Sequence, residues 1–449
     1  MQFSDFSFHP QIQSAIRKAG FDKPTPIQER AIPVGLAGHD LIGTAQTGTG
    51  KTAAFVLPII QRLLTDTSKL GRTRALIVTP TRELAEQINT TIRRFTAGTP
   101  IRSATVYGGV GMQPQDRALR TGVEIIVACP GRLLDHIDRG AASLNGVEML
   151  VLDEADRMLD MGFLPSVKRI LSYIPRQRQT MLFSATFAPE LQQLASDSLR
   201  NPKRVDVATS APTKTVAHAL YPVSQHLKTK LLLKLLSTTD TNSVLIFTRT
   251  KHRANRVAEQ IGRAGYNTAV LHSNKSQNQR QLALDNFRSG KVQILVATDI
   301  AARGIDVATI SHVINYDIPD TADTYIHRIG RTGRAEREGD AMTLVTSEDN
   351  AMVRDIERVL KAPIERRTLQ DFDYSAPAPV LNEFQREPRG QQFRQPRGGQ
   401  PANRGQRPQG SQQPQRRAAN SAPQRDGQRP KSSGDNATRR PNRSAVAAK

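Results

Sequence analysis

The sequence Asp40-Leu-Ile-Gly-Thr-Ala-Gln-Thr-Gly-Thr-Gly-Lys-Thr52 decides the fold class. It predicts a short strand, then a glycine-containing loop, then the start of a helix. Lys51 would reach the β- and γ-phosphates of a nucleotide, and Thr52 would offer its hydroxyl to Mg²⁺. Ala45 stands where the strict pattern has glycine, so a plain Gly-Thr-rich turn is the alternative. Backbone N–H groups that can surround phosphates come from Ala45, Gln46, Thr47, Gly48, Thr49 and Gly50.

An Asp-Glu pair follows the apolar run Met149–Leu152, which predicts a buried strand. In a protein with a phosphate-binding loop, Asp153 would hold Mg²⁺, directly or through water. Glu154 would orient and deprotonate an attacking water. Taken alone, Asp-Glu-Ala-Asp is more often a solvated acidic helix start. The preceding strand and the phosphate-binding loop favour the catalytic interpretation.

The segment His327-Arg-Ile-Gly-Arg-Thr-Gly-Arg334 concentrates arginine in the second half of the chain. If it is helical, its spacing of three places Arg328, Arg331 and Arg334 on one face. Such a cluster can neutralise charge on a transferring phosphoryl group. The alternative is a basic surface loop that touches nucleic acid, and the phosphate-binding loop favours the first interpretation.

Short apolar runs alternate with amphipathic stretches, a pattern typical of βαβ units around a parallel sheet. A Thr/Ser-rich linker at 208–216 divides them into two α/β domains, 1–207 and 217–374. Polar and glycine clusters follow many strands, so the carboxyl ends of the strands should form one functional surface. The expected strands are Asp40–Gly43, Ala75–Thr79, Thr105–Tyr107, Ile125–Ala128, Met149–Leu152, Thr180–Phe183, Ser243–Phe247, Thr268–Leu271, Gln293–Ala297, His312–Asn315 and Met342–Val345.

The composition changes near residue 375. The 449-residue chain has a formal net charge of +22 and a pI near 10.6. Residues 376–449 carry half of that charge, with 15 Lys and Arg against four Asp and Glu. This stretch is too poor in large apolar side chains to offset the entropy of ordering it. We predict a disordered basic tail, 375–449, that binds RNA without sequence preference, with a solubility appendage as the alternative.

Charge and cysteine content narrow the class of protein further. The basic balance points to a polyanionic partner, nucleic acid before an anionic membrane surface. A single cysteine, Cys129, excludes an intramolecular disulfide framework and is typical of a reducing cytoplasm. No apolar run approaches the length of a membrane span, and the N-terminus lacks a signal peptide pattern. We expect a cytoplasmic protein with no membrane partner.

From about Phe3 to Thr368 the chain resembles the DEAD-box ATP-dependent RNA helicases of superfamily 2, and most of all the bacterial RhlE group. The resemblance implies two tandem RecA-like domains, ATP and Mg²⁺ as cofactors and RNA as partner. Residues 1–29 contain Gly20-Phe-Asp-Lys-Pro-Thr-Pro-Ile-Gln28, which is similar to the family's adenine-reading motif. Phe21 would stack on adenine and Gln28 would bond its edges, which implies ATP rather than GTP.

The same resemblance assigns roles to residues of both domains. Arg331 and Arg334 match the arginine fingers, with His327 beside them as a catalytic candidate, and Asp306 would approach the ribose. Ser184-Ala-Thr186 resembles the motif that couples hydrolysis to unwinding, and Asp156 is assigned to the same coupling. The residues implied to contact RNA are Pro80, Thr81, Arg82, Gly108, Gly109, Pro130, Gly131, Arg132, Thr248, Arg249, Arg280 and Thr298.

Two residues depart from the family pattern. Cys129 stands where threonine is usual before Pro-Gly-Arg, which removes one hydroxyl contact expected with RNA. Ser273 stands where glycine commonly follows His272, which would stiffen that turn.

The expected function is RNA-dependent ATP hydrolysis that locally unwinds or remodels short RNA duplexes and RNA–protein complexes through closure of two domains. Ribosome assembly or RNA decay is the setting that the resemblance suggests, with ribosomal precursors or RNA-decay proteins as further partners. An ATP-gated RNA clamp or annealing protein is one alternative, and a DNA-directed superfamily 2 helicase is another.

Overall fold

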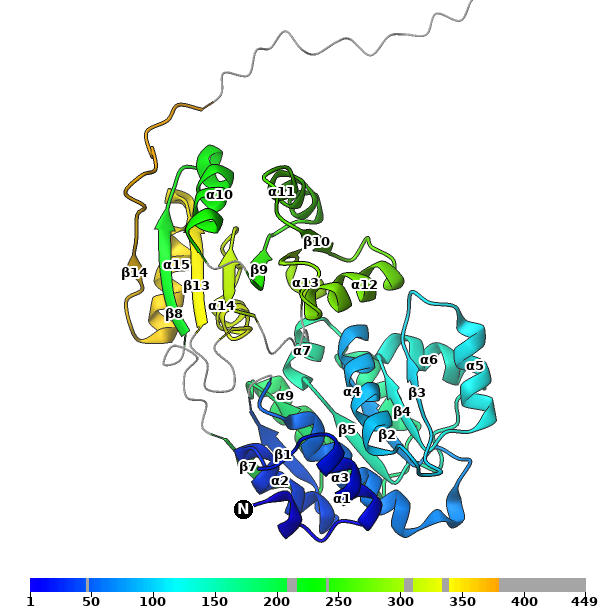
Figure 1. Ribbon diagram of the computed structural model, residues 1–449. Helices are drawn as coiled ribbons and strands as arrows, with labels where there is room; N and C mark the ends of the chain where they lie inside the picture. The colour runs from blue at the N-terminus through cyan, green and yellow to red at the C-terminus, as the bar shows by residue number, and fades with distance from the viewer. Residues whose placement is uncertain (46–47, 208–215, 240–241, 303–309, 333–338, 379–449) are drawn as a thin grey trace, which may run out of the picture. The chain divides into compact units, whose positions relative to one another are not determined.

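The computed structural model describes residues 1–45, 48–207, 216–239, 242–302, 310–332 and 339–378 (Figure 1). These residues belong to one compact unit, Met1–Val380. Several predictions lie outside the described residues: Gln46, Thr47, the linker at 208–215, Asp306, Arg334 and the tail from residue 379 onward. No described helix is long and apolar enough to cross a membrane.

The first domain is built on a seven-stranded, wholly parallel sheet with the order β3-β4-β2-β5-β6-β1-β7. The segments expected to bind a nucleotide follow β1 and β5, which are separated in the sheet only by β6. Its strands are β1 Leu41–Thr44, β2 Ala75–Val78, β3 Ser103–Val106, β4 Ile125–Ala128, β5 Met149–Leu152, β6 Gln179–Ser184 and β7 Lys203–Asp206.

The second domain repeats this topology. Its seven parallel strands have the order β10-β11-β9-β12-β13-β8-β14, which is the same permutation as in the first domain when each strand number is raised by seven. The two sheets therefore present their strand ends in equivalent places. The strands are β8 Val216–Pro222, β9 Val244–Phe247, β10 Thr268–Leu271, β11 Ile294–Ala297, β12 His312–Asn315, β13 Gly339–Val345 and β14 Glu365–Arg366.

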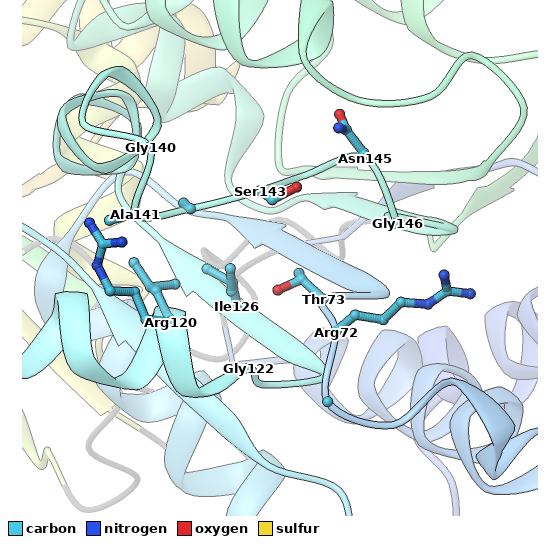
Figure 2. Close-up of a pocket in the computed structure, with 13 residues that line it drawn as sticks. Arg72, Thr73, Arg120, Gly122, Ile126, Gly140, Ala141, Ser143, Asn145 and Gly146 are labelled. Carbon is cyan, nitrogen blue, oxygen red and sulfur yellow. The ribbon is translucent and has the colours of Figure 1, made fainter. Parts of the chain in front are cut away.

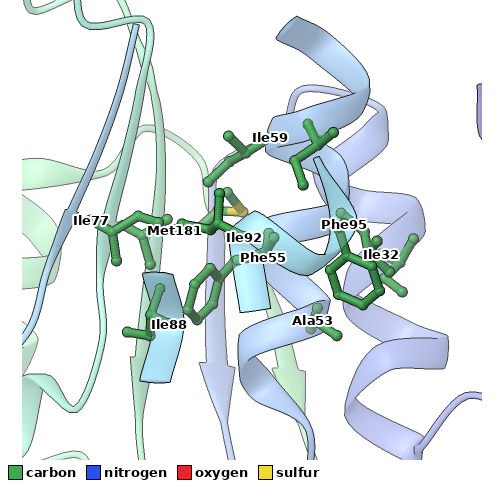
Figure 3. Close-up of a cluster of buried hydrophobic side chains, with 14 of the residues drawn as sticks. Ile32, Ala53, Phe55, Ile59, Ile77, Ile88, Ile92, Phe95 and Met181 are labelled. Atoms are coloured by element: carbon green, nitrogen blue, oxygen red, sulfur yellow. The ribbon is translucent and has the colours of Figure 1, made fainter. Parts of the chain in front are cut away.

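Alternation along the strands divides each domain into two cores, because successive side chains of a strand point to opposite faces. In β2, Ile77 faces a core with Phe55 and Ile88 (Figure 3). Leu76 and Val78 face the core on the other side of the sheet. Helices cover both faces, which gives an α/β/α sandwich. The first face carries α1 Pro10–Lys18, α2 Pro26–Leu36, α3 Lys51–Thr65 and α4 Arg82–Phe95; the second carries α5 Met112–Thr121, α6 Pro130–Asp138, α7 Ala155–Asp160, α8 Leu164–Ser172 and α9 Pro189–Ser198.

The second domain is layered in the same way. One core takes in residues 369–376, where Tyr374 and Ala376 pack on it and the Ala376 carbonyl lies 2.7 Å from His226 Nε2. Ordered packing therefore continues past residue 374, where we placed the domain boundary. The helices are α10 Lys228–Thr238 and α11 Lys251–Arg263 on this core, and α12 Gln277–Arg288, α13 Asp299–Ala302, α14 Ala322–Ile329 and α15 Asn350–Leu360 on the other.

All eleven expected strands are present, with ends shifted by at most three residues, but three further strands were missed. β7 has the sequence Lys-Arg-Val-Asp, in which only Val205 is buried, so it lacks the apolar run of a central strand. β14 has only two residues and, like β7, lies at a sheet edge. β8 begins at Val216, the last residue of the expected linker, and that residue is buried.

Candidate active site

Two glycines shape the phosphate-binding loop. Gly48 and Gly50 have φ of 84° and 91°, the left-handed region that side chains with a Cβ rarely adopt. Gly50 is the N-cap of α3, and a Cβ on it would collide with the side-chain amide of Gln28. The loop thus places the N-terminus of α3 at the carboxyl end of β1, where backbone N–H groups can bind a phosphate.

A hollow of about 220 Å³ lies at this helix start. Lys51 is 6% exposed, and its Nζ donates a hydrogen bond to the Ala45 carbonyl at 2.7 Å. The hollow therefore combines a buried cation, a hydroxyl and two carboxylates in one place. Its lining comprises Phe21, Gln28, Gly48, Gly50, Lys51, Thr52, Ala53, Leu84, Gln87, Thr91, Asp153, Glu154 and Arg331.

The Asp-Glu pair lies at the end of β5, as the sequence predicted. Burial raises the pKa of Asp153 to about 7, although the nearby Lys51 opposes this shift and Glu154 adds to it. Glu154 adopts φ 50° and ψ 50°, and its N–H donates to Asp153 Oδ1 at 3.0 Å. A non-glycine residue in this region stores backbone strain, which is typical of functional sites.

Asp156 joins the Asp-Glu segment to the strand-end motif Ser184–Thr186. Its Oδ2 accepts hydrogen bonds from the N–H groups of Ala185 and Thr186, at 3.1 and 3.0 Å, and from the Thr186 hydroxyl at 3.2 Å. Burial alone would raise the pKa of Asp156, but Lys51, Arg157 and the Thr186 N–H together hold it below its ordinary value. The Ser184 hydroxyl donates to the Thr186 carbonyl at 2.6 Å, so the three residues assigned to coupling are joined through Thr186.

Gln28 connects the segment expected to read adenine to the phosphate-binding loop. Its Oε1 accepts from the Thr25 N–H at 2.9 Å, and its Nε2 donates to the Gly50 carbonyl at 3.0 Å. An amide has two acceptor sites and two hydrogens, so each atom can still make one bond to a base. Phe21 contacts Phe3 and Phe95 edge-on, at ring-centroid distances of 5.7 and 5.5 Å, and these contacts fix its ring beside the hollow.

The arginine segment differs from our expectation. Helix α14 ends at Ile329, so Arg331 lies beyond it, and Arg328 and Arg331 do not share the helical face that a helical segment would have given them. Arg328 is buried and forms a bidentate ion pair with Asp299, with both N···O distances at 2.6 Å. Arg331 lines the hollow, and His327 contributes to the low pKa of Asp156.

The RNA-assigned motifs of the first domain meet at the carboxyl ends of β2, β3 and β4. Gly109 has φ 81°, and a Cβ on it would displace the guanidinium of Arg82. Arg132, in the first turn of α6, donates to the Val110 carbonyl at 3.1 Å. The other residues assigned to RNA lie beside these two arginines in the chain. Pro80 and the α4 N-cap Thr81 precede Arg82, Gly108 precedes Gly109, and Pro130 and Gly131 begin α6.

In the second domain, Thr248 and Thr298 directly follow β9 and β11, and the Arg249 N–H donates to Asp317 at 2.9 Å. Arg280 behaves differently from an open RNA contact, because its buried guanidinium donates to Glu83 Oε1 at 2.8 Å. Glu83 was not singled out from the sequence. The sequence around Glu83 gave no sign that its partner is Arg280, almost 200 residues away.

Sequence reasoning also missed part of the hollow. Leu84, Gln87 and Thr91 line it from α4. Their spacing of three and four residues places them on one helix face, which was the available signal. Gln87 Nε2 is buried without a hydrogen-bond partner among the described residues.

The two departures from the family pattern have different structural settings. Cys129 is the N-cap of α6 and makes no side-chain cap, and burial raises the pKa of its thiol to about 12. Its position is one where a threonine hydroxyl would accept a backbone N–H. Ser273 does not have a positive φ, so a serine at this position causes no backbone strain.

This fold and this site define a two-domain helicase with a phosphate-binding loop. A DEAD/DEAH box helicase model matches residues 25–194, and a helicase conserved C-terminal domain model matches residues 227–336. The chain belongs to the DEAD/DEAH box helicase family. The family expected from the sequence is thus confirmed, and the RhlE subgroup stays a prediction.

Named relatives cover most of the chain. The DEAD-box ATP-dependent RNA helicase CshA of Bacillus subtilis is 40% identical over 365 residues, which are 81% of this chain and 73% of the relative. RNA helicase CrhR of Synechocystis is 44% identical over 369 residues, 82% and 74% of the two chains. The structure of Saccharomyces cerevisiae Dbp5 bound to RNA and ADP BeF3 is similar with a TM-score of 0.73 and 31% identity, over 82% of this chain and 95% of that one.

Proposed function

We propose that this chain is an RNA-dependent ATPase that locally unwinds or remodels short RNA duplexes and RNA–protein complexes. The observation that carries the proposal is the hollow in which Lys51 and Thr52 lie with Asp153, Glu154 and Arg331. A phosphate-binding loop, a strand-end carboxylate pair and an arginine are the parts that phosphoryl transfer requires. Family membership and an RNA-bound structural relative support the same function.

ATP is proposed to place its adenine against Phe21 and Gln28 and its phosphates on the loop at 45–52. Lys51 would exchange the Ala45 carbonyl for the β- and γ-phosphates, which its flexible side chain allows. Glu154 would orient the attacking water and accept its proton. Arg331 and Arg334 would neutralise the charge that develops on the transferring phosphoryl group.

Thr52 and Asp153 are the proposed ligands of Mg²⁺. Both line the hollow, and both offer the hard oxygen donors that Mg²⁺ prefers, together with substrate phosphates and water. When bound, Mg²⁺ supplies charge neutralisation at the phosphate oxygens. Because the pKa of Asp153 is raised to about 7, this carboxyl still holds a proton below that pH. It must lose the proton before it can serve as a ligand.

Domain closure would link ATP to RNA. ATP that contacts both Lys51 and Arg331 favours a closed arrangement by its higher affinity for that state. RNA held at the strand ends of both domains favours the same state, so ATP and RNA should bind cooperatively. The Asp156 contacts to Thr186 provide a direct path from the carboxylate pair to the coupling motif. Contacts to the RNA backbone imply little sequence preference.

The variant Glu154→Gln tests this function. It should retain ATP and RNA binding, lose turnover, and remain on RNA when ATP is present. Glu190→Gln is the matched control, because it makes the same change at an exposed residue and should leave hydrolysis unchanged. Near-normal hydrolysis by Glu154→Gln would contradict the role of Glu154. A wild-type protein that holds RNA with ATP but never releases a strand from a duplex would support the RNA-clamp alternative.

Ribosome assembly or RNA decay in the cytoplasm is the proposed setting, and it rests on the resemblance to the RhlE group. Cross-linking of the protein to RNA in cells, followed by sequencing, would test it. Enrichment of neither ribosomal precursors nor decaying transcripts would contradict this setting while leaving the proposed chemistry intact.

A further inference from the structure

Two hollows lie at the amino ends of β2, β3 and β4, on the edge of the first sheet opposite the phosphate-binding loop. The first, of about 560 Å³, lies between the turn before β2, the end of α5 and the loop at 140–146 (Figure 2). The second, of about 500 Å³, lies between the end of α4, the start of β3 and the side of α5. Gly122 lines both hollows, so they form one continuous surface.

This surface is strongly basic. Arg72 and Arg120 lie at the two ends of the first hollow (Figure 2), and Arg93, Arg102 and Arg117 line the second. All five are exposed, and among the residues that the structure describes no acidic side chain lines either hollow. Within the described part of the chain, only Arg102 has a carboxylate within 4 Å, since its Nη2 lies 3.8 Å from Glu124.

Nearby acids are committed to other partners. Asp116, on α5 beside Arg117, lies 2.7 Å from the Nδ1 of the buried His136. Glu148 is paired with Arg74 at 2.9 Å. Apart from Arg102, the arginines of the two hollows therefore have no ion pair with the described acids around them.

The surface is held in shape by Glu124, which is fully buried at the amino end of β4. Its carboxylate accepts from the Gly71 N–H at 2.6 Å and from the Arg102 N–H at 2.7 Å. Gly71 also lies so close to Gly122 that a Cβ on Gly122 would collide with the carbonyl oxygen of Gly71. The turns that carry Arg72 and Arg102 are thus fixed before any ligand binds, which lowers the cost of ordering them.

Helix α5 connects this surface to the RNA-assigned turns. It begins at Met112, directly after the Gly108–Gly109 turn, and ends at Thr121 between the hollows. Ten residues span about 15 Å. Arg117 and Arg120 are three residues apart in the second half of the helix, so they lie on one of its faces, where Arg117 lines the second hollow and Arg120 the first.

We propose that the arginine surface formed by Arg72, Arg93, Arg102, Arg117 and Arg120 is a second, sequence-independent RNA-binding site. It would hold the phosphate backbone of RNA that leaves the first domain past Gly108–Gly109. Arginine binds phosphate with paired N–H donors, and no aromatic side chain from the described part of the chain lines the hollows to stack on bases. The inference rests on the proposed RNA function of the Gly108–Gly109 turn. An acidic protein segment is the competing occupant.

The triple variant Arg72→Gln, Arg117→Gln, Arg120→Gln tests the site. Its affinity for a short single-stranded RNA that fills only the core site is compared with its affinity for the same RNA extended at either end. Lys18→Gln, Lys168→Gln, Lys203→Gln is the matched control, because it removes the same charge from exposed residues elsewhere in the first domain. ATP turnover with the short RNA reports whether each variant is folded.

We expect the arginine variant to lose roughly tenfold in affinity for one of the extended RNAs. The slope of log affinity against log salt should fall by about 2, since each lost single-strand phosphate contact contributes about 0.7. Binding and turnover with the short RNA should stay at the wild-type level, and the lysine control should match wild type throughout.

Other outcomes overturn the proposal. Unchanged affinity and salt slope for both extended RNAs would exclude RNA as the occupant, and polyglutamate binding to the wild type that the arginine variant loses would then identify an acidic protein segment. An equal loss in the lysine control would reduce the effect to net charge, and an equal loss on the short RNA would place the arginines in the core site. A wild-type protein without RNA-stimulated turnover would instead refute the proposed function itself.

Discussion

The Asp153 carboxyl gives a quantitative test of the site's electrostatics. It is 2% exposed, and burial raises its pKa from 3.8 to about 7. Between these two values the folded protein retains a proton that the unfolded chain has released. The folded state therefore loses stability as the pH rises from about 4 to about 7, and above pH 7 the loss is complete.

The size of the effect follows from the shift. Each pKa unit corresponds to about 1.36 kcal/mol, so the full penalty is about 4 kcal/mol. Asparagine has nearly the same shape and cannot ionise. Asp153→Asn should therefore raise the free energy of unfolding of the nucleotide-free, Mg²⁺-free protein by up to about 4 kcal/mol at pH 8. At pH 5 the gain should be only about 1 to 2 kcal/mol, because this pH lies only about one unit above the pKa of Asp153 in the unfolded chain.

Urea unfolding in EDTA, followed by circular dichroism because the chain has no tryptophan, measures both values. Asp160→Asn is the control, because it makes the same change at an exposed residue of α7 and should alter stability at neither pH. No gain at pH 8, or the same gain at both pH values, would refute the reasoning. The variant should also lose ATP hydrolysis, since a proposed Mg²⁺ ligand is removed.

Three further changes test other parts of the account. Arg331→Ala should lower the rate of ATP hydrolysis by on the order of 10³ with RNA affinity retained in the absence of nucleotide, and a change in RNA affinity alone would exclude an arginine finger. Cys129→Thr should add an N-cap to α6 and raise the free energy of unfolding by about 1 kcal/mol; a thermal midpoint at or below that of wild type would show that the hydroxyl cannot cap there. Deletion of 381–449 should weaken RNA binding and flatten its salt dependence while turnover at saturating RNA is unchanged, and an unchanged salt slope would favour the solubility appendage.

The central strands were predictable because they are buried on both faces and read as continuous apolar runs, such as Leu-Val-Leu at 150–152. Edge strands give no such signal. β7 keeps two exposed cations and an exposed aspartate, and its place in the sheet depends on pairing with β1. Its existence is a property of the assembled sheet and not of the local sequence.

The site shows the same division between local and long-range information. The order strand, loop, helix placed Lys51, Thr52 and Asp153 correctly in one hollow. The end of α14 at Ile329 could not be read from the regular spacing of its arginines, so Arg328 and Arg331 were given one role although they have two environments. The pairing of Glu83 with Arg280 joins residues that no local pattern relates.

The central claim is that ATP hydrolysis at this site depends on RNA. The most direct test is the rate of hydrolysis by the full chain with no nucleic acid, with single-stranded RNA, and with DNA of matched sequence, using GTP as the control nucleotide. We predict strong stimulation by RNA alone and no hydrolysis of GTP, because Phe21 and Gln28 are the proposed contacts to adenine. Equal stimulation by DNA would contradict it and favour a DNA-directed helicase, and equal use of GTP would contradict the adenine site.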